Sequence, residues 1–358
     1  MNRDSASVVE KGARVLVRLP NWLGDVLMCT PSLSALVCER PDLELTALVK
    51  PGMAPVAKNL PGVTRVLLVE DTGFRGTLAL AAKLRTLEFD AALVFPKGFR
   101  EALLVRLARI PLRIGLDTDH RGFLFSDPVR FTRDHWLRHH TEQFGRVLSP
   151  LDIDPGAALV EYTPSPEDRD RAAGILERAG LSEQPFAVYH VTASKLPRAW
   201  HPDRFAQVAL RLHEEAGLQP VLLGVESDAP VHEAFCAACP KAVDLRGQTS
   251  LPTMAAILER AALFAGSDSG PMHLAAAVGA PVVAVFGPGA PDKTAPRLPD
   301  DRIRVIYADL PCSPCRQSFW KDCRPSSAGK PPCMEAIHPS AVAEAALSLL
   351  GASRKQSG

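Results

Sequence analysis

The chain has 358 residues, of which 46% are hydrophobic and 23% charged, and its formal net charge is +1 at pH 7. This length accommodates two domains with full cores, and the near-neutral charge gives no overall argument for binding nucleic acid. No apolar run approaches the roughly 20 residues needed to span a bilayer, and residues 1–14 lack the apolar core of a signal peptide. We therefore expect a cytoplasmic protein whose eight cysteines are mostly reduced.

The first half of the chain alternates between apolar runs and helical patterns. Residues 14–19 predict a strand, which is followed by a polar turn at 20–25 and a helix over 26–39. Further strands are expected at 43–49, 63–69, 91–95 and 113–116, and further helices at 77–87, 100–108 and 136–148. Ligands of open α/β sheets bind at the carboxyl ends of the strands, so the turn at 20–25 is a candidate site.

Residues 149–166 are rich in proline, glycine and acidic residues and carry little periodicity, so we interpret them as a linker. The alternation then restarts. Strands are expected at 186–191, 221–225, 242–245 and 303–307, and helices at 166–179, 202–216, after 226–228 and at 339–350. We therefore predict an α/β fold of two doubly wound, Rossmann-like domains, 1–160 and 161–358, facing a central cleft.

The most informative stretch, residues 263–287, predicts a strand, a glycine-bearing turn, a small-residue helix and a second strand. Pro271 suits the first helical position, and Ser269 or Gly270 suits the cap before it. The unpaired N–H groups and the positive dipole end there predict an anion site, and we expect a phosphate. The alternative is a tight crossover turn without a ligand. No Gly-x-Gly-x-x-Gly or Walker-type motif follows a strand, which argues against a Rossmann dehydrogenase or a P-loop enzyme.

Three polar turns at strand ends carry the residues that could take part in chemistry. Asp25 is either a general base for an attacking hydroxyl or a carboxylate that complements a helix dipole. Lys195 and Arg198 are either solvated cations or a pair that neutralises a diphosphate leaving group. Glu226 is either a partner of a ribose diol or another carboxylate at a helix start.

Two further residues belong to the turn and helix after residue 265. Asp268 would repel a phosphate, so we interpret it as a brace of the turn through backbone N–H groups. His273 is either packed in the core or a hydrogen-bond donor to phosphate or sugar. The residue types alone leave both roles of His273 open.

Four cysteines fall in a strip rich in proline and cations, namely Cys312, Cys315, Cys323 and Cys333. A C-x2-C pair often begins a tetrahedral zinc site, so the strip is a candidate structural zinc site, although its later spacings differ from those of a standard finger. The alternative is a loop of reduced cysteines that docks a partner or the acceptor. Cys236 and Cys239 fall in an expected helix and are interpreted as packing residues.

Together these motifs resemble glycosyltransferase family 9, the bacterial ADP-heptose–lipopolysaccharide heptosyltransferases. The segment Pro-Asn-Trp-Leu-Gly-Asp at 20–25 looks like the N-terminal motif, especially that of heptosyltransferase II. Residues 194–205, with Trp200 followed by His-Pro, look like the basic-Trp-Pro motif. Residues 268–273 (Asp-Ser-Gly-Pro-Met-His) with 281–288 look like the donor-binding signature. The similarity spans nearly the whole chain.

The resemblance implies a GT-B fold, with the acceptor bound by residues 1–160 and the nucleotide sugar by residues 161–358. We also expect the last helix to pack back on the N-terminal domain. The implied reaction is a metal-independent, inverting transfer of heptose from ADP-L-glycero-D-manno-heptose to the inner core of lipopolysaccharide. The implied partners are that donor and a lipid A–inner core acceptor, with no required cofactor and no nucleic acid.

On the acceptor side, the resemblance implies that Asp25 is the catalytic base and that Asn21, Trp22 and Gly24 belong to the acceptor-side loop. The acceptor hydroxyl would attack the anomeric carbon from the face opposite ADP while Asp25 removes its proton. Because a diphosphate leaves as an anion, no second carboxylate is needed. Closure of the two domains would exclude water.

On the donor side, the resemblance assigns the diphosphate cation to Arg198, or to Lys195 if the gap in the motif is placed differently. The family more often has Lys-Arg-Trp or Lys-His-Trp where this chain has Pro-Arg-Ala-Trp. Glu226 matches the carboxylate near the ribose. The residues that match the donor loop are Asp268, Ser269, Gly270, Met272 and His273.

Three other functions fit parts of the pattern. A family member could use another sugar nucleotide or another acceptor. A sugar-nucleotide epimerase would need acid and base groups on both faces of the sugar, whereas Asp25 is the one plausible group in this sequence. A two-lobed sugar-binding protein is normally exported, which the N-terminal residues do not favour.

Because the implied acceptor is a membrane lipid, we expect peripheral contact with the cytoplasmic face of the inner membrane. The candidate basic face comprises Arg100, Arg106, Arg109 and Arg113. The alternative is a solvated helix face.

Overall fold

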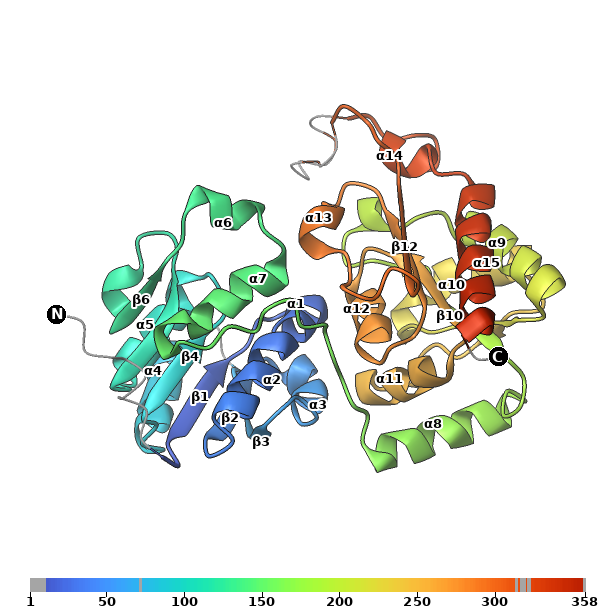
Figure 1. The fold of residues 1–358 in the computed structure, drawn as a ribbon. Helices are drawn as coiled ribbons and strands as arrows, with labels where there is room; N and C mark the ends of the chain where they lie inside the picture. The colour runs from blue at the N-terminus through green and yellow to red at the C-terminus, as the bar shows by residue number, and fades with distance from the viewer. Residues whose placement is uncertain (1–10, 71–72, 313–314, 316–319, 321–322, 357–358) are drawn as a thin grey trace. The chain divides into compact units, whose positions relative to one another are not determined.

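The computed structural model describes residues 11–70, 73–312, 315, 320 and 323–356, with side chains up to residue 351. The chain divides into two compact units, Met1–Tyr162 and Thr163–Gly358 (Figure 1). The boundary lies inside the linker expected at 149–166. Each unit contains an all-parallel sheet of six strands covered by helices, so the predicted α/β class with two doubly wound sheets is confirmed.

The sheet of the first unit has the strand order β3-β2-β1-β4-β5-β6. Its strands are β1 (Arg14–Arg18), β2 (Glu44–Val49), β3 (Val63–Leu68), β4 (Ala91–Val94), β5 (Leu112–Asp117) and β6 (Asp127–Arg130). Its helices are α1 (Leu23–Met28), α2 (Thr30–Glu39), α3 (Ala54–Ala57), α4 (Phe74–Arg85), α5 (Phe99–Leu107), α6 (Arg133–Leu137) and α7 (His140–Gly145). Helices α4 and α5 pack together on one face of the sheet, while α1, α2 and α7 contact one another.

Two helices of this unit differ from the prediction. The helix expected over 26–39 is split at Cys29 into α1 and α2, because Pro31 has no backbone N–H to continue the hydrogen-bond ladder. The helix expected over 136–148 is divided into α6, α7 and a 3-10 turn at Arg146–Leu151. Both expectations merged short helical segments that the backbone separates.

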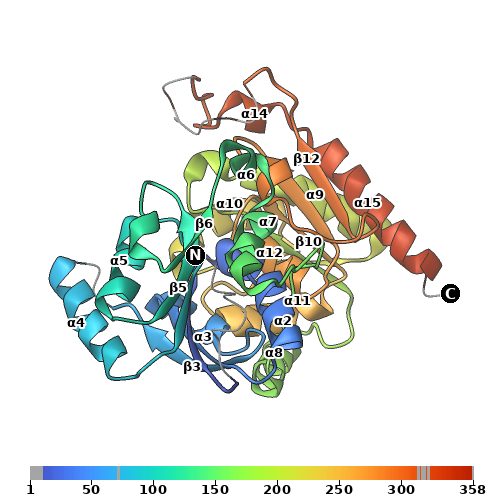
Figure 2. The same cartoon turned by 60° about the vertical axis from the view of Figure 1, so that its left-hand side comes forward.

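The sheet of the second unit has the order β12-β11-β10-β7-β8-β9. Its strands are β7 (Phe186–His190), β8 (Gln219–Leu222), β9 (Val243–Asp244), β10 (Leu263–Ser267), β11 (Val282–Phe286) and β12 (Ile303–Tyr307). Its helices are α8 (Pro166–Arg178), α9 (Pro202–Ala216), α10 (Ala229–Ala238), α11 (Leu251–Arg260), α12 (Gly270–Ala277), α13 (Pro291–Thr294), α14 (Pro332–Glu335) and α15 (Pro339–Gln356). Helix α9 lies between α10 and α15, and α11 contacts α8 and α12 (Figure 2).

The last helix packs on its own unit. Val342, Ala343, Ala346 and Leu349 of α15 are buried in the same core cluster as the strands of the second sheet. The buried face of the helix is therefore used within the second unit, and packing of the helix on the N-terminal domain stays a prediction. This face packs beside α9 and against β10, β11 and β12.

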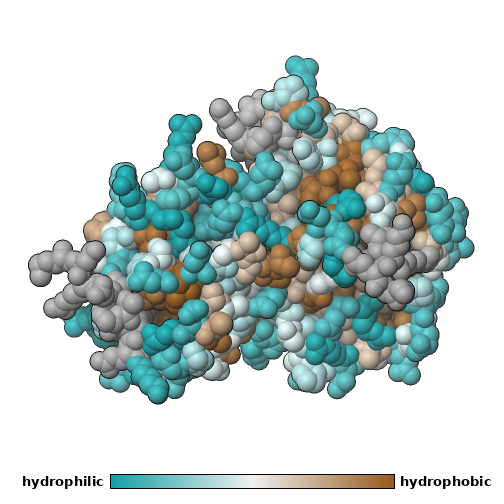
Figure 3. All heavy atoms as spheres, viewed as in Figure 1, coloured by the Kyte–Doolittle hydropathy of each residue, from teal (hydrophilic) through white to brown (hydrophobic). Residues whose placement is uncertain are grey.

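In the part of the chain that the structure describes, no helix is both long enough and apolar enough to cross a bilayer. Hydrophilic residues cover most of the face in Figure 3, and hydrophobic residues gather there in small groups.

Candidate functional site

Each sheet places one of the predicted turns at its central pair of strands. In the first unit, β2 and β3 extend from β1 in one direction and β5 and β6 extend from β4 in the other. In the second unit, β7 and β10 are the corresponding central pair. Loops leave such a pair in opposite directions, which opens a crevice at the carboxyl ends of the strands. The turn at Asp25 follows β1, and the turn at Ser269 follows β10.

A cavity of about 330 Å³ opens at the end of β1 and β4. Carboxylates, a lysine, a histidine, an amide and aromatic rings form its wall. The lining residues are Pro20, Asn21, Trp22, Asp25, Pro96, Lys97, Gly98, Glu101, His140 and Phe144. Trp22 is 67% exposed, whereas Gly24 is buried. The cavity therefore brings together three of the predicted acceptor-side residues, Asn21, Trp22 and Asp25.

Asp25 lies in the first turn of α1, where its charge complements the helix dipole. Its Oδ1 is 3.6 Å from Nδ1 of His140, the first residue of α7. Both side chains are slightly more than one quarter exposed, so a ligand in the cavity can reach them. Sequence reasoning missed His140, because nothing in the local pattern of α7 indicates that it meets a turn more than 100 residues earlier.

A buried arginine, Arg18, contacts the turn through Asn21. Arg18 is 1% exposed, and its guanidinium donates to Oδ1 of Asn21 at 2.7 Å and lies 3.4 Å from the carboxylate of Glu101. Burial lowers the pKa of Arg18, and Glu101 opposes that effect. Such a buried pair is costly to break, because removing one partner would leave the other charged, buried and unpaired. The hydrogen bond from Arg18 therefore fixes the side chain of Asn21 in one orientation.

Lys97 also lines the cavity, and its ammonium group lies near three aromatic rings. Its Nζ lies 4.3 Å from the ring centroid of Trp136 and 5.2 Å from that of Phe131, and it donates to Oε1 of Gln143. Aromatic faces attract an ammonium group, so these contacts hold the lysine in one place. Sequence reasoning did not select Lys97, whose contacts come from segments far along the chain.

The predicted basic face does not form a set of free cations. Arg113 donates to the carbonyls of Pro111 and Leu124 at 2.8 and 3.0 Å, and also to that of Ile110. Arg100 lies 3.6 Å from Glu101. Arg113 therefore stabilises its own loops. The basic membrane face stays a prediction.

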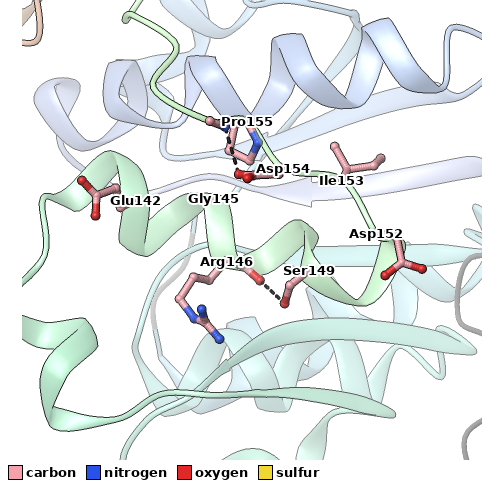
Figure 4. Close-up of a pocket in the computed structure, with 9 residues that line it drawn as sticks. Glu142, Gly145, Arg146, Ser149, Asp152, Ile153, Asp154 and Pro155 are labelled. Atoms are coloured by element: carbon pink, nitrogen blue, oxygen red, sulfur yellow. Dashed lines mark hydrogen bonds between the residues drawn. The ribbon is translucent and has the colours of Figure 1, made fainter.

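A second cavity in the first unit, of about 360 Å³, lies beside α7 and the segment at 152–156 (Figure 4). Ser149 donates to the carbonyl of Arg146 and the backbone N–H of Gly156 donates to Asp154, as the dashed lines show. None of the predicted site residues lines this cavity. We assign it no function.

In the second unit, the turn after β10 has the predicted cap and helix. Ser269 is the N-cap of α12 with an extended backbone, Gly270 is the first helical residue and Pro271 the second. These three residues are half-buried, so the helix end remains accessible. Gly289 keeps the turn open, because a Cβ there would come within 2.6 Å of the Asp268 carboxylate.

Arg198 is the cation that the structure brings to this turn. Its Nη1 lies 3.4 Å from Oδ2 of Asp268, which is 6% exposed. Asp268 thus pairs with the cation, a role that the sequence alone did not indicate. Lys195 is exposed on the same loop.

His190, at the end of β7, is a second contact of the turn. Its Nδ1 is 3.3 Å from Oγ of Ser269, and the imidazole is 8% exposed. Burial lowers the pKa of His190 to about 4, although the charge of Asp228 opposes this shift. The imidazole is therefore neutral near pH 7. Sequence reasoning missed this residue, since its position at the end of an apolar strand favours packing.

The remaining predicted donor residues are divided between core and surface. Met272 is fully buried and His273 is 4% exposed, so packing is the role that their positions support directly. Glu226 is 81% exposed, and its Oε1 lies 4.0 Å from Nε of Arg246. Glu226 begins the 3-10 turn after β8, and that strand ends four residues before it, at Leu222.

The four cysteines of the strip differ in their exposure to solvent. Cys312 is exposed, Cys315 and Cys323 are half-buried, and Cys333 is buried. Burial raises the pKa of Cys333 to about 11, and the charges of Cys312 and Cys315 add to this effect. Within residues 11–356, excluding the undescribed gaps, no three His, Cys, Asp or Glu side chains are grouped for a metal ion. The structural zinc stays a prediction.

A family model described as glycosyltransferase family 9 (heptosyltransferase) matches residues 77–321. The chain is 27% identical to lipopolysaccharide heptosyltransferase 3 of Escherichia coli over 285 residues, 74% of this chain and 80% of that protein. It is 26% identical to lipooligosaccharide heptosyltransferase 2 of Haemophilus influenzae over 312 residues, 83% of this chain and 90% of that protein. The solved structure of E. coli ADP-heptose lps heptosyltransferase II matches with a TM-score of 0.78 at 24% identity, covering 95% of this chain and 99% of that one. This likeness confirms the GT-B-type architecture.

Proposed function

Because the chain belongs to glycosyltransferase family 9 and is a glycosyltransferase, we propose that it transfers heptose from ADP-L-glycero-D-manno-heptose to the inner core of lipopolysaccharide, with inversion at the anomeric carbon. The names of the relatives support both substrates, since they are lipopolysaccharide and lipooligosaccharide heptosyltransferases and one is called an ADP-heptose enzyme. The reaction requires no metal or other cofactor in this proposal.

One observation carries the proposal within the structure. Each unit has an accessible polar turn at its central strand pair, and the two turns have complementary chemistry. The turn of the first unit contains a carboxylate, Asp25, in a cavity large enough for a sugar residue. The turn of the second unit contains a helix N-terminus beside Arg198. An acid–base group and an anion-binding end are what an acceptor hydroxyl and a nucleotide diphosphate require.

In the proposed reaction, the acceptor oxygen forms a bond to the anomeric carbon while the bond from that carbon to the β-phosphate oxygen breaks. The electron pair leaves with ADP, and the proton of the acceptor hydroxyl moves to the Asp25 carboxylate. His140, 3.6 Å away, adds a polar partner that can orient this carboxylate. Attack from the face opposite ADP accounts for inversion, and the positioning of the two reactants supplies much of the rate.

The departing diphosphate gains charge as it leaves. The N–H groups at the start of α12 and the guanidinium of Arg198 are suited to hold that charge, and Lys195 is a second cation on the same loop. Glu226, which is exposed, is suited to accept hydrogen bonds from the ribose diol. The Arg198–Asp268 pair favours Arg198 over Lys195 as the main diphosphate contact.

We also propose that the protein works in the cytoplasm, in peripheral contact with the inner membrane. The nature of the acceptor supports this contact. Aromatic side chains such as Trp22, Phe123 and Trp136 are exposed on the first unit and are suited to an interfacial position.

The test is transfer with defined substrates. Purified protein is incubated with ADP-heptose and heptose-deficient lipopolysaccharide, and ADP release, product mass and anomeric configuration are measured. We expect one heptose per acceptor, inverted relative to the donor. Tight ADP binding without transfer would favour another sugar or acceptor. Conversion of the donor in the absence of an acceptor would instead indicate an epimerase.

A further inference from the structure

A segment that includes Cys333, the last cysteine of the strip, contacts the loop that contains Arg198. We call residues 326–337, which include α14, the α14 strap. Nζ of Lys330 donates to the carbonyl of Ala199 at 2.7 Å. Nε1 of Trp200 donates to the carbonyl of Met334 at 3.2 Å. The strap therefore binds the loop through main-chain and side-chain atoms immediately after Arg198.

Glu335 is the centre of this contact. Its Oε1 lies 3.1 Å from Nε2 of His201 and accepts from the Ser326 hydroxyl at 2.5 Å. Its Oε2 accepts from Nη2 of Arg204 at 2.7 Å. Arg204 also donates to the carbonyls of Glu335 and Ile337 at 2.8 and 2.9 Å. One carboxylate thus joins the strap to the beginning of α9.

The charge of Glu335 suits this role. The Ser326 hydroxyl, followed by the charges of His201 and Arg204, holds the pKa of Glu335 below its usual range, so the group is a carboxylate at neutral pH. Burial lowers the pKa of Lys330 and of His201, while Glu335 opposes both shifts. Charge-assisted hydrogen bonds of this kind are stronger and more directional than neutral ones.

The other side of the loop is fixed to the anion-binding turn. The N–H of Trp200 donates to Oγ of Ser267 at 2.9 Å, and Arg198 lies 3.4 Å from Asp268. Trp200 is fully buried, with its ring edge-on to Phe205 at 4.8 Å. The loop is therefore held between the β10–α12 turn and the α14 strap, and a change on either side alters where Arg198 lies.

We propose that Glu335 is a positioning residue for the diphosphate site: through His201 and Arg204 it holds the loop so that Arg198 stays beside the N-terminus of α12. This inference rests on the proposed function, in which that turn binds the diphosphate. Glu335 touches neither the diphosphate nor the reacting atoms in this role. Its effect is transmitted through the loop.

The test compares ligands that differ in phosphate. Binding of ADP and of adenosine is measured by calorimetry for the wild type, Glu335→Gln and the control Glu344→Gln, whose carboxylate is 68% exposed on α15. We expect Glu335→Gln to raise the Kd for ADP about tenfold, the effect of one weakened charge-assisted contact, with adenosine unchanged. Glu335→Asp, which keeps the charge, should recover part of the affinity. The control should bind both ligands as the wild type does.

A double-mutant cycle tests whether the effect passes through Arg198. If it does, Glu335→Gln should weaken ADP binding much less in an Arg198→Ala background than in the wild type, because the two changes act on one contact. Additive effects would overturn the proposal. Equal losses for ADP and adenosine would also overturn it, since they would mean a general loss of structure.

If Glu335→Gln does not fold, the variant Lys330→Met tests the same role of the strap. It removes the contact with Ala199 while keeping the length of the side chain, and it should also weaken ADP selectively. ADP binding within twofold of the wild type in the variants would overturn the role of the strap. A folded wild-type protein that does not bind ADP would instead remove the proposed function, and this inference with it.

Discussion

Nδ1 of His140 lies 3.6 Å from Oδ1 of Asp25, although the two residues belong to helices at opposite ends of the first unit's sequence. The imidazole ring also packs edge-on against Phe144, which lines the same cavity. A short movement would allow His140 to donate to Asp25 and leave the other carboxylate oxygen facing the cavity. This pair is the part of the first unit best suited to proton transfer.

Replacing Asp25 with Asn should remove the general base while keeping the shape of the side chain. We expect kcat to fall by about 10²–10⁴-fold, with little change in melting temperature, because general-base catalysis contributes about that much. The measurement is initial ADP release with saturating donor and acceptor. Asp152→Asn is a matched control, since Asp152 is exposed in a left-handed conformation that Asn tolerates. Transfer at the wild-type rate by Asp25→Asn would exclude the proton-transfer role.

The two candidate diphosphate cations can be separated by substitution. Arg198→Ala should weaken ADP binding by about 10–100-fold, because it removes a cation held beside the helix end and leaves Asp268 buried with a negative charge. Lys195→Ala should cost about threefold or less, as for an exposed cation in water. Titration calorimetry with ADP measures both. A larger loss for Lys195→Ala would reverse the assignment.

His190 should make stability fall as the solution becomes acidic. The pKa of His190 is about 4 in the folded protein, below the ordinary value of 6.5, so the unfolded chain binds the extra proton first. Its stabilising contribution is fully present above about pH 6.5 and is lost as the pH falls toward 4, by about 3 kcal/mol at most.

Thermal unfolding between pH 4.5 and 7 tests this expectation. His190→Gln should show a smaller decrease of melting temperature across that range than the wild type, even if it is less stable at pH 7. His338→Gln, at an exposed position, serves as the control. Parallel curves for the wild type and His190→Gln would show that the buried imidazole is not responsible for the acid sensitivity.

Transfer should not depend on a divalent metal. In the proposed reaction, α12 and Arg198 provide the positive field that a metal supplies in other transferases. We expect excess EDTA to change the initial rate by less than about twofold. Complete loss of transfer with EDTA, restored by one added metal, would contradict a metal-independent reaction.

Elemental analysis of the same preparation addresses the cysteine strip separately. Zinc bound in proportion to protein, and lost in Cys312→Ser and Cys333→Ser, would establish the structural site. Its absence would favour the reduced-cysteine alternative.

Local chemistry was enough to predict much of the fold. Parallel strands buried on both faces are continuously apolar, so a run such as Val282–Phe286 predicts its own boundaries. The β10–α12 turn was equally local, because cap and proline preferences act within a few residues. Strand β6 and helix α11 had no expected counterpart. The short β6 contains Pro128, which weakens any strand pattern.

The sequence by itself therefore determined the fold class, the linker and the turns at which chemistry is expected, since these depend on periodicity and on neighbouring residues. Tertiary structure decided which distant side chains complete those turns. The order of strands brings His190 to Ser269, 79 residues apart, and the packing of α7 brings His140 to Asp25. It also buried Met272, paired Arg198 with Asp268 and brought Glu335 of the α14 strap beside His201. No local pattern encodes such contacts, because their energies arise when separate elements pack against one another.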